Sequence, residues 1–249
     1  MRRSALAVVT LTTLLALPTH AAEITAFISG AARNAFDDVV PLFERSSDHK
    51  VTMHSDIQQV LFKRIAAGET FDVIVLSIDV EGPASKGYVV AGSRTALGRT
   101  GVGVAVRQGA PRPDFSTVDA FKRMLLNAKS LTHSEGSSGK HFLSLLDRLG
   151  MADAIKPKIV QPVGSGGASR LVASGKAELA VIGLPPVLAV PGLDWLGWLP
   201  DELNDWIVFT GGVGSKAKEP EAARAFLHFL ATPEAGAIFK SKGLEPVAP

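Results

Sequence analysis

Two patterns of apolar residues alternate along the first hundred residues. Apolar positions recur at helical spacing over residues 36–43 and again over 57–65. Short apolar segments at 23–28 and 50–53 precede these two stretches, and Phe71–Ser77 is a continuous apolar run. Such a run is typical of a parallel strand that is covered on both faces. The order strand, helix, strand, helix, strand predicts an α/β fold with right-handed crossovers.

The same alternation begins again after residue 100. Ser116 can begin a helix, Gly150 and Gly175 can end helices, and Thr232 followed by Pro233 predicts the start of the last one. The expected strands lie at 100–107, 130–133, 159–163, 179–183 and 205–210. We expect one helix to begin near residue 116, a second to run from 139 to 150 and a third to end at 175. Two more helices are expected over 220–230 and 233–240. The Pro-, Gly- and Trp-rich segment 184–205 is expected to be irregular.

This repetition predicts two α/β lobes with a cleft between them. We expect residues 23–100 and 211–249 to form the first lobe and residues 101–210 to form the second. Two strands, near Gly101–Arg107 and Ile207–Gly212, would cross between the lobes. In such folds a ligand binds where helix N-termini at the strand ends present free backbone amides to the cleft.

The first 22 residues have the layout of a secretory signal peptide. Arg2 and Arg3 precede an apolar run from Ala5 to Pro18, and small residues follow as far as Ala22. The run is shorter than the roughly 20 residues that a membrane span needs, so cleavage is favoured over the alternative of an uncleaved anchor. We therefore expect a periplasmic protein, exported through a signal peptide that comprises residues 1–22.

Composition excludes several classes of protein. The chain has 249 residues, of which 46% are hydrophobic and 20% charged, so it can bury a core and is unlike a disordered tail. Without Arg2 and Arg3, basic and acidic residues both number 24, and such a neutral mature chain is not expected to bind nucleic acid. The absence of cysteine excludes disulfides, zinc ribbons and thiol nucleophiles.

Several of the strand-to-helix turns consist of serine and glycine. Such turns let a ligand approach the backbone, and the helix dipole adds about half a positive charge at a helix N-terminus. Serine and glycine also cap helices and permit tight turns, which is the alternative for any single turn. For the set we favour an anion-binding cleft. The candidate ligand-binding residues in these turns are Ser29, Gly30, Ser55, Ser137, Ser138 and Gly166.

Cations and histidines lie beside the same turns. Arg33, Lys140 and Arg170 are expected in the first turns of helices, where a cation opposes the helix dipole and a bound anion would compensate for it. A solvated surface charge is the alternative for each of them. His54 and His141 could act as general bases because imidazole titrates near neutral pH. No HxH or HExxH spacing is present, so neither a metal nor another cofactor is expected.

Five segments of the mature chain together resemble the periplasmic solute-binding proteins, and among them the molybdate-binding family. They are EITAFISGAARNAFDDVVPLFE, RIAAGETFDVIV, GVGVAVRQGAP, LVASGKAELAVIGL and KEPEAARAFLHFLATPEAGAIFKSKGLEP. The resemblance covers essentially the whole mature length. It implies a type 2 periplasmic-binding-protein fold, and a monomer that delivers a small anionic ligand to the membrane permease of an ABC transporter.

The positions that would hold molybdate depart from that family's pattern. The family binds its oxyanion with serines of the first two cleft turns, with backbone amides and with a late tyrosine. Ala31 stands at the first serine position, and Ile182–Pro186 stands where the tyrosine is expected, while the single tyrosine is Tyr88. In the second turn, Ser55 and Gln58 are the polar candidates. These departures from the family pattern favour a small organic carboxylate over molybdate as the ligand.

Two further segments, GSSGKHFLSLLDRLG and PGLDWLGWLPDELND, resemble a divergent branch that includes a bacterial aconitate isomerase. This branch implies an alternative function, a 1,3-proton shift between trans- and cis-aconitate that needs a base and no cofactor. Arg33, Lys140 and Arg170 would then hold the carboxylates, and His54 or His141 would carry the proton. We favour binding over catalysis because this fold usually binds and no catalytic constellation stands out.

Overall fold

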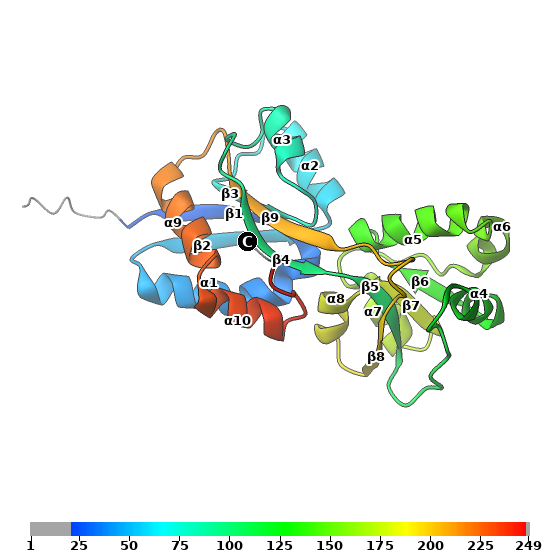
Figure 1. Cartoon of the computed structure of the whole chain (residues 1–249). Helices are drawn as coiled ribbons and strands as arrows, with labels where there is room; N and C mark the ends of the chain where they lie inside the picture. Colours follow the sequence, from blue (N-terminus) through cyan, green and yellow to red (C-terminus); the bar gives the residue numbers. More distant parts are fainter. Residues whose placement is uncertain (1–20, 248–249) are drawn as a thin grey trace, which may run out of the picture.

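The chain folds into two α/β lobes, each built on its own mixed sheet (Figure 1). The computed structural model describes residues 21–247, so the signal peptide predicted over 1–22 lies almost entirely outside the described residues. The first sheet has the strand order β2-β1-β3-β9-β4 and the second the order β6-β7-β5-β8. The predicted α/β class and two-lobe architecture are confirmed.

The first sheet combines parallel and antiparallel pairs. Strand β1 is parallel to β2 and β3, whereas β9 is antiparallel to β3 and β4. Its strands are β1 (Glu23–Ser29), β2 (Lys50–Asp56), β3 (Val73–Leu76), β4 (Thr95–Thr100) and β9 (Ile207–Val213). The helices of this lobe are α1 (Arg33–Ser46), α2 (Gln58–Ala66), α3 (Glu81–Ser85), α9 (Pro220–Leu230) and α10 (Pro233–Ser241), and a short 3-10 turn, η1 (Gly30–Ala32), precedes α1.

The second sheet is smaller. Strand β7 is parallel to β6 and antiparallel to β5, which in turn is antiparallel to β8. Its strands are β5 (Val102–Arg107), β6 (Leu131–His133), β7 (Leu179–Gly183) and β8 (Leu193–Trp198). Its helices are α4 (Val118–Asn127), α5 (Ser137–Arg148), α6 (Ala152–Ile155), α7 (Gly167–Ala173) and α8 (Leu184–Leu188), and a 3-10 turn, η2 (Lys156–Lys158), follows α6.

Aromatic residues at helical spacing form the core of the first lobe. Phe36 and Phe43 of α1 are buried, as their spacing predicts. The Phe36 ring lies 5.6 Å from that of Phe239 in α10, and the Phe43 ring lies 4.8 Å from that of Phe226 in α9. The C-terminal helices therefore return to cover the helix that follows the first strand, as Figure 1 shows in blue and red.

Two adjacent stretches of chain cross between the lobes. Strands β4 and β5 are separated by Gly101 alone and lie in different sheets. The strand predicted over 100–107 corresponds to β5, which begins at Val102, because Thr100 ends β4 and the chain crosses between the lobes at Gly101. A Cβ on Gly101 would lie 2.8 Å from the Asn204 side chain on the returning crossing, and Asn204 Oδ1 accepts the Val102 N–H at 2.8 Å. The outgoing and returning crossings are therefore packed against each other.

The segment predicted to be irregular, 184–205, contains both α8 and β8. The prediction of irregular structure rested on the Pro and Gly residues of this segment, whereas pairing with β5 gives β8 its order. Trp195 and Trp198 of β8 pack edge to face at 4.8 Å, and Arg99 lies over the Trp206 ring at 4.3 Å. The tryptophans thus pack where the two lobes join.

The residue limits predicted for the lobes remain a proposal, and β9 already pairs in the first sheet from Ile207. None of the helices within residues 21–247 has the length and apolar character to cross a membrane.

Candidate functional site

A cavity lies between the two lobes, where helix N-termini meet the strand ends. Its volume of about 50 Å³ has room for a group of a few heavy atoms, because a water molecule needs about 10–15 Å³ of such volume. We call it the interlobe cavity. Its lining residues are Ser29, Gly30, Ala31, Ile57, Gln58, Ser77, Thr100, Ser134, Glu135, Gly136, Ser137, Ser138, Gly164, Ser165, Gly166, Gly167, Ala168, Ser169, Ile182, Gly183, Pro185, Pro186, Ile207 and Phe209.

The helices that begin at this cavity are not capped by their N-cap side chains. The N-cap residues of α1, α2 and α5 are Ala32, Ile57 and Gly136, and none of the three makes a side-chain cap hydrogen bond. Within the first turn of α5, the Gly139 N–H does donate to Ser134 Oγ at 3.0 Å. Other first-turn amides, such as the Val60 N–H in α2, donate to a backbone carbonyl. The first two amides of α2 and of α5 have no hydrogen-bond partner within residues 21–247, so they can receive a ligand, which favours the anion-binding interpretation of these turns over capping.

Hydroxyl groups from both lobes meet at the cavity. Ser137 Oγ, at the start of α5, donates to the Ser77 carbonyl at 2.7 Å and lies 3.1 Å from Ser77 Oγ. Ser134 Oγ and Ser138 Oγ are 2.7 Å apart, and Ser169 Oγ donates to the Pro186 carbonyl at 2.8 Å. Ser137 and Ser169 already donate their single hydroxyl proton to a carbonyl, so in this arrangement they can only accept from a ligand. The hydroxyl of Ser77 and one hydroxyl of the Ser134 and Ser138 pair keep a proton that can be donated to a ligand.

The lobes are in direct contact across the cleft. Besides the Ser77 and Ser137 pair, Gln59 Nε2 donates to the Glu135 carbonyl at 3.1 Å, and Asn34 Nδ2 donates to the Pro185 carbonyl at 3.4 Å. In each of these pairs one residue belongs to the first lobe (Ser77, Gln59 or Asn34) and its partner belongs to the second lobe. The cleft is therefore closed in this arrangement.

The loop that carries Ser77 is fixed by the crossing strand β9. The Thr210 hydroxyl accepts the Val80 N–H at 3.0 Å and donates to the Ile78 carbonyl at 2.8 Å. In the same loop a backbone N–H and Arg94 hold the pKa of Asp79 below its ordinary value. Ser77 is thus presented to the cavity by a well-bonded turn.

A second cavity, of about 340 Å³, adjoins the first along the cleft. We call it the arginine cavity, because Arg33 and Arg170 line it. Arg33 Nε lies 3.4 Å from the carboxylate of Asp37, and Arg170 Nη2 donates to the Val163 carbonyl at 3.3 Å. The two cavities share Gly30, Ala31, Ser165, Gly166 and Pro186. The other residues that line the arginine cavity are Asn34, Asp37, Ser55, Ala189 and Val190.

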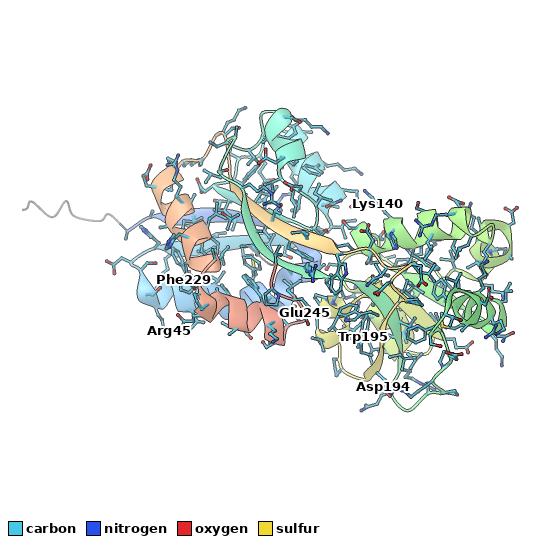
Figure 2. All side chains as sticks on the ribbon, in the orientation of Figure 1. Arg45, Lys140, Asp194, Trp195, Phe229 and Glu245 are labelled. Carbon is cyan, nitrogen blue, oxygen red and sulfur yellow. The ribbon has the colours of Figure 1, made fainter. Side chains whose placement is uncertain are left out.

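The structure therefore divides the predicted ligand-binding residues between the two cavities. The interlobe cavity is lined by Ser29, Gly30, Gln58, Ser137, Ser138 and Gly166. The arginine cavity is lined by Arg33, Ser55 and Arg170, together with Gly30 and Gly166. Lys140, labelled on α5 in Figure 2, is exposed and lines neither cavity.

Neither candidate histidine lines these cavities. His54 lies in β2, with its ring edge to face against Phe27 at 5.8 Å. His141 Nε2 is hydrogen-bonded to the Leu203 carbonyl at 2.7 Å, and its Nδ1 lies 3.7 Å from the Asp205 carboxylate. These contacts join α5 to the chain that returns toward the first lobe.

Several lining residues were not singled out from the sequence. Ser77 ends the predicted buried strand, and Ser134 and Glu135 lie in the small-residue turn before α5. Their signal was their position directly after a strand, which is where such folds place ligand-binding residues. Glu135 is the single charged side chain among the residues that line the interlobe cavity. Within residues 21–247, no group of three or more His, Cys, Asp or Glu side chains could hold a metal ion.

Comparison with known proteins adds three findings. A model of the family described as bacterial extracellular solute-binding protein matches residues 24–245. The aconitate isomerase of a Pseudomonas species is 34% identical over 236 residues, which are 90% of this chain and 88% of that protein. The molybdate-binding protein of Azotobacter vinelandii is 28% identical over 242 residues, which are 92% of each chain.

The solved structure of the periplasmic molybdate-binding protein from Azotobacter vinelandii superimposes with a TM-score of 0.74. It covers 91% of this chain and 99% of that chain at 19% identity. At this identity the likeness concerns the fold, and it confirms the predicted type 2 periplasmic-binding-protein fold. The similar proteins divide by name into a binding protein and an isomerase, so the ligand must be argued from the cavities.

Proposed function

Since this chain belongs to the bacterial extracellular solute-binding protein family, we propose that it is a receptor for a small organic anion with more than one carboxylate. The observation that carries the proposal is the pair of adjoining cavities. One is lined by serine hydroxyls and helix N-termini together with Glu135, the other is lined by two arginines, and they share five residues. A ligand that occupies both would place separate anionic groups in two different environments.

The interlobe cavity suits one carboxylate. Its volume of about 50 Å³ matches a group of a few heavy atoms, and it offers the free first-turn amides of α2 and α5 beside the hydroxyls of Ser77 and Ser138. Backbone N–H groups at helix N-termini favour negative charge without the entropy loss of ordering long side chains. The carboxylate would therefore be held mainly by backbone and hydroxyl donors.

The arginine cavity suits the remaining carboxylates. A guanidinium group presents paired N–H donors that match a planar carboxylate, and Arg33 and Arg170 both reach this cavity from helices of opposite lobes. The Arg33 side chain is 58% exposed and its contact with Asp37, at 3.4 Å, is an exposed ion pair of the kind that contributes little to stability. Both arginines can therefore move onto a ligand at small energetic cost.

A tetrahedral oxyanion would use only part of this site. It would fill the interlobe cavity and leave both arginines without a ligand group, and the serine and tyrosine positions expected for molybdate are occupied by Ala31 and by Ile182–Pro186. These features favour an organic carboxylate over molybdate.

A thermal-shift panel tests the class of ligand. It would contain molybdate, tungstate, sulfate, citrate and both aconitates. A ligand present at 100 times its dissociation constant should stabilise the folded protein by about 2.7 kcal/mol. We expect the polycarboxylates to raise the melting temperature most. A large shift with molybdate and none with any carboxylate would contradict the proposal.

Arginine variants then test how the ligand is held. Arg33→Ala and Arg170→Ala should each weaken citrate binding about 10- to 100-fold, as expected for the loss of a charge-assisted hydrogen bond. Arg45→Ala is the matched control, since Arg45 lies on the same helix as Arg33 at the end remote from the second lobe (Figure 2). Unchanged citrate affinity in both cavity variants would exclude a role for the arginine cavity.

A second candidate function is the isomerisation of aconitate, favoured by the 34% identity to an aconitate isomerase over 90% of this chain. The reaction removes a proton from one allylic carbon, moves the double bond and returns a proton to the other allylic carbon. The predicted proton carriers His54 and His141 lie outside the lining of both cavities, whereas the Glu135 carboxylate can accept a proton within it. Glu135 is therefore the better placed base.

Incubation with trans-aconitate, followed by NMR in deuterated water, separates the two functions. A receptor leaves trans-aconitate unchanged, whereas an isomerase produces cis-aconitate and exchanges the allylic hydrogens with solvent. Under the second candidate, Glu135→Gln should abolish turnover while His54→Ala and His141→Ala retain it. Loss of turnover in a histidine variant that still binds aconitate would restore that histidine as the proton carrier.

We further propose that residues 1–22 are removed on export and that the mature protein acts in the periplasm as a monomer that delivers its ligand to an ABC permease. The signal-peptide layout of the sequence and the extracellular description of the family support this. Mass spectrometry of the exported protein would give its N-terminus, and light scattering would give its oligomeric state. A mature chain that retains Arg2 and Arg3 would contradict the proposal.

A further inference from the structure

We propose that Glu135 and Gln58 make the interlobe cavity selective for anions that carry a hydrogen-bond donor, such as hydroxycarboxylates, over anions that carry only acceptors. The inference rests on the proposed function of the same site and specifies the class of carboxylate that it takes. It starts from two acceptor groups in a cavity whose other polar groups are backbone amides, backbone carbonyls and hydroxyls.

Glu135 is held in the loop before α5 by contacts from both sides of the cleft. One carboxylate oxygen, Oε2, accepts the Gly164 N–H at 2.6 Å, and the backbone carbonyl of Glu135 accepts from Gln59 Nε2 at 3.1 Å. Among residues 21–247, no ion pair to this carboxylate and no hydrogen bond to Oε1 is found. An anion-binding cavity therefore contains a carboxylate that no cation neutralises.

Gln58 contributes the second acceptor from the other lobe. It is the first residue of α2 and one of the residues that line the cavity, and it is only 5% exposed. Its Oε1 atom is fully buried and has no hydrogen-bond partner within the described chain. Buried polar atoms in native structures almost always have a partner, so this acceptor is left to pair with a donor of a ligand when the side chain turns toward the cavity.

An unneutralised carboxylate distinguishes between ligands that the hydroxyls cannot distinguish. Serine hydroxyls adapt to a donor or an acceptor, whereas an ionised carboxylate only accepts. A ligand carboxylate bound at the helix N-termini would be repelled by Glu135 unless a proton lies between them. A ligand hydroxyl directed at Glu135 adds a charge-assisted hydrogen bond that offsets that repulsion. The site should therefore reject the analogue that lacks the hydroxyl.

Citrate and tricarballylate form a matched pair for the test, since they differ by one hydroxyl group. Isothermal titration calorimetry at pH 7.5 should give citrate an affinity about 10- to 150-fold higher than that of tricarballylate, which is the usual effect of a hydrogen bond to a charged group. In Glu135→Gln this preference should fall to within about threefold, mainly because tricarballylate binds more tightly once the charge is removed. The new amide keeps a carbonyl that can accept the Gly164 N–H, so the loop is preserved.

Glu202→Gln is the control for a change of charge outside the cavity, because Glu202 is exposed and does not line it. That variant should keep the wild-type preference. Equal affinities of the wild type for citrate and tricarballylate, or an unchanged ratio in Glu135→Gln, would overturn the inference.

Measuring the affinities for hydrogen phosphate and sulfate as well shows whether a negative result contradicts this inference or the proposed function. If the wild type binds neither tricarboxylate but prefers hydrogen phosphate to sulfate, the proposed carboxylate function fails and the selection for donors stands. If carboxylates bind without regard to their hydroxyl groups, the function stands and the selection fails. Binding of none of the four anions would overturn both.

Discussion

Replacing Gly30 by alanine should hold the cleft open. Gly30 follows β1 and does not have a positive φ, so its backbone conformation is open to alanine. In the closed arrangement, however, an added Cβ would lie 2.3 Å from Ser165 Oγ and 2.6 Å from Ser165 Cβ. Ser165 belongs to the opposite lobe. Rotation of its side chain would move the hydroxyl but not the Cβ, so the lobes themselves must separate.

The size of the effect follows from these distances. Carbon atoms in ordinary contact are about 3.5–4.0 Å apart, so the lobes must part by about 1 Å at this point. Overpacking of this kind typically costs about 1–3 kcal/mol. Because the ligand is proposed to bind the closed cleft, that cost should appear as an affinity for citrate lower by about 5- to 150-fold. The stability of the unliganded protein should change far less, since opening the cleft relieves the contact.

A double-mutant cycle isolates this contact. Citrate affinity would be measured by calorimetry for the wild type, Gly30→Ala, Ser165→Gly and the double variant. Ser165→Gly alone reports what the serine contributes to the ligand, and the double variant should recover most of the affinity that Gly30→Ala loses. Gly236→Ala is the matched control, because no atom lies within 4 Å of the position that its Cβ would take.

Small-angle scattering supplies a readout that needs no ligand. Gly30→Ala should have a larger radius of gyration than the wild type, and the double variant should restore the wild-type value. The reasoning would be refuted if Gly30→Ala binds citrate as tightly as the wild type, or if the double variant recovers nothing.

Two further predictions concern stability. Gly139→Ala should destabilise the second lobe by about 3 kcal/mol or more in urea unfolding, because the added Cβ would lie 1.6 Å from the Ser134 carbonyl oxygen, a backbone atom that cannot move aside easily. Gly136→Ala is the control and should be nearly neutral, since the atom nearest to its Cβ would be 3.8 Å away. Similar urea midpoints for the two variants would contradict this prediction. The hydrogen bond from Arg64 lowers the pKa of Glu69 below its ordinary value of 4.5. The ion pair therefore stabilises the folded protein above pH 4.5, and this stabilisation is lost as the pH falls through the lowered pKa of Glu69. Glu69→Gln should therefore be less stable than the wild type at pH 7, by less than about 1 kcal/mol for so exposed a pair, and the two unfolding curves should converge under acid conditions; a difference that persists at pH 2 would refute the ionic origin.

Much of the fold could be predicted from local pattern. The helical spacing of Phe36 and Phe43 and the continuous apolar run ending at Ser77 correspond to α1 and β3. The cap at Thr232 also proved correct, since its hydroxyl accepts the Ala235 N–H at 3.4 Å. These features depend on residues within a few positions of each other, so the sequence alone contains them.

The cleft-facing turns were also within reach of the sequence. Ser29 ends β1, Gly30 follows it, Ser137 and Ser138 begin α5, and all four line the interlobe cavity. Parallel strands bring their carboxyl ends to one edge of a sheet, so successive turns of this kind gather there. The composition of the turns, together with this topological rule, was sufficient to predict that these residues gather at one cavity.

What only the tertiary structure decided concerns pairs of residues far apart in the chain. The break at Gly101, which sends β4 and β5 into different sheets, and the pairing of β8 with β5 arise from strand partners that periodicity does not identify. The placement of Glu135 at the interlobe cavity, and of His141 outside it against the Leu203 carbonyl, is likewise set by segments distant in the chain that pack against each residue. A side-chain pattern records whether a position is buried, but not which distant segment buries it, and the chemistry of this site depends on those distant partners.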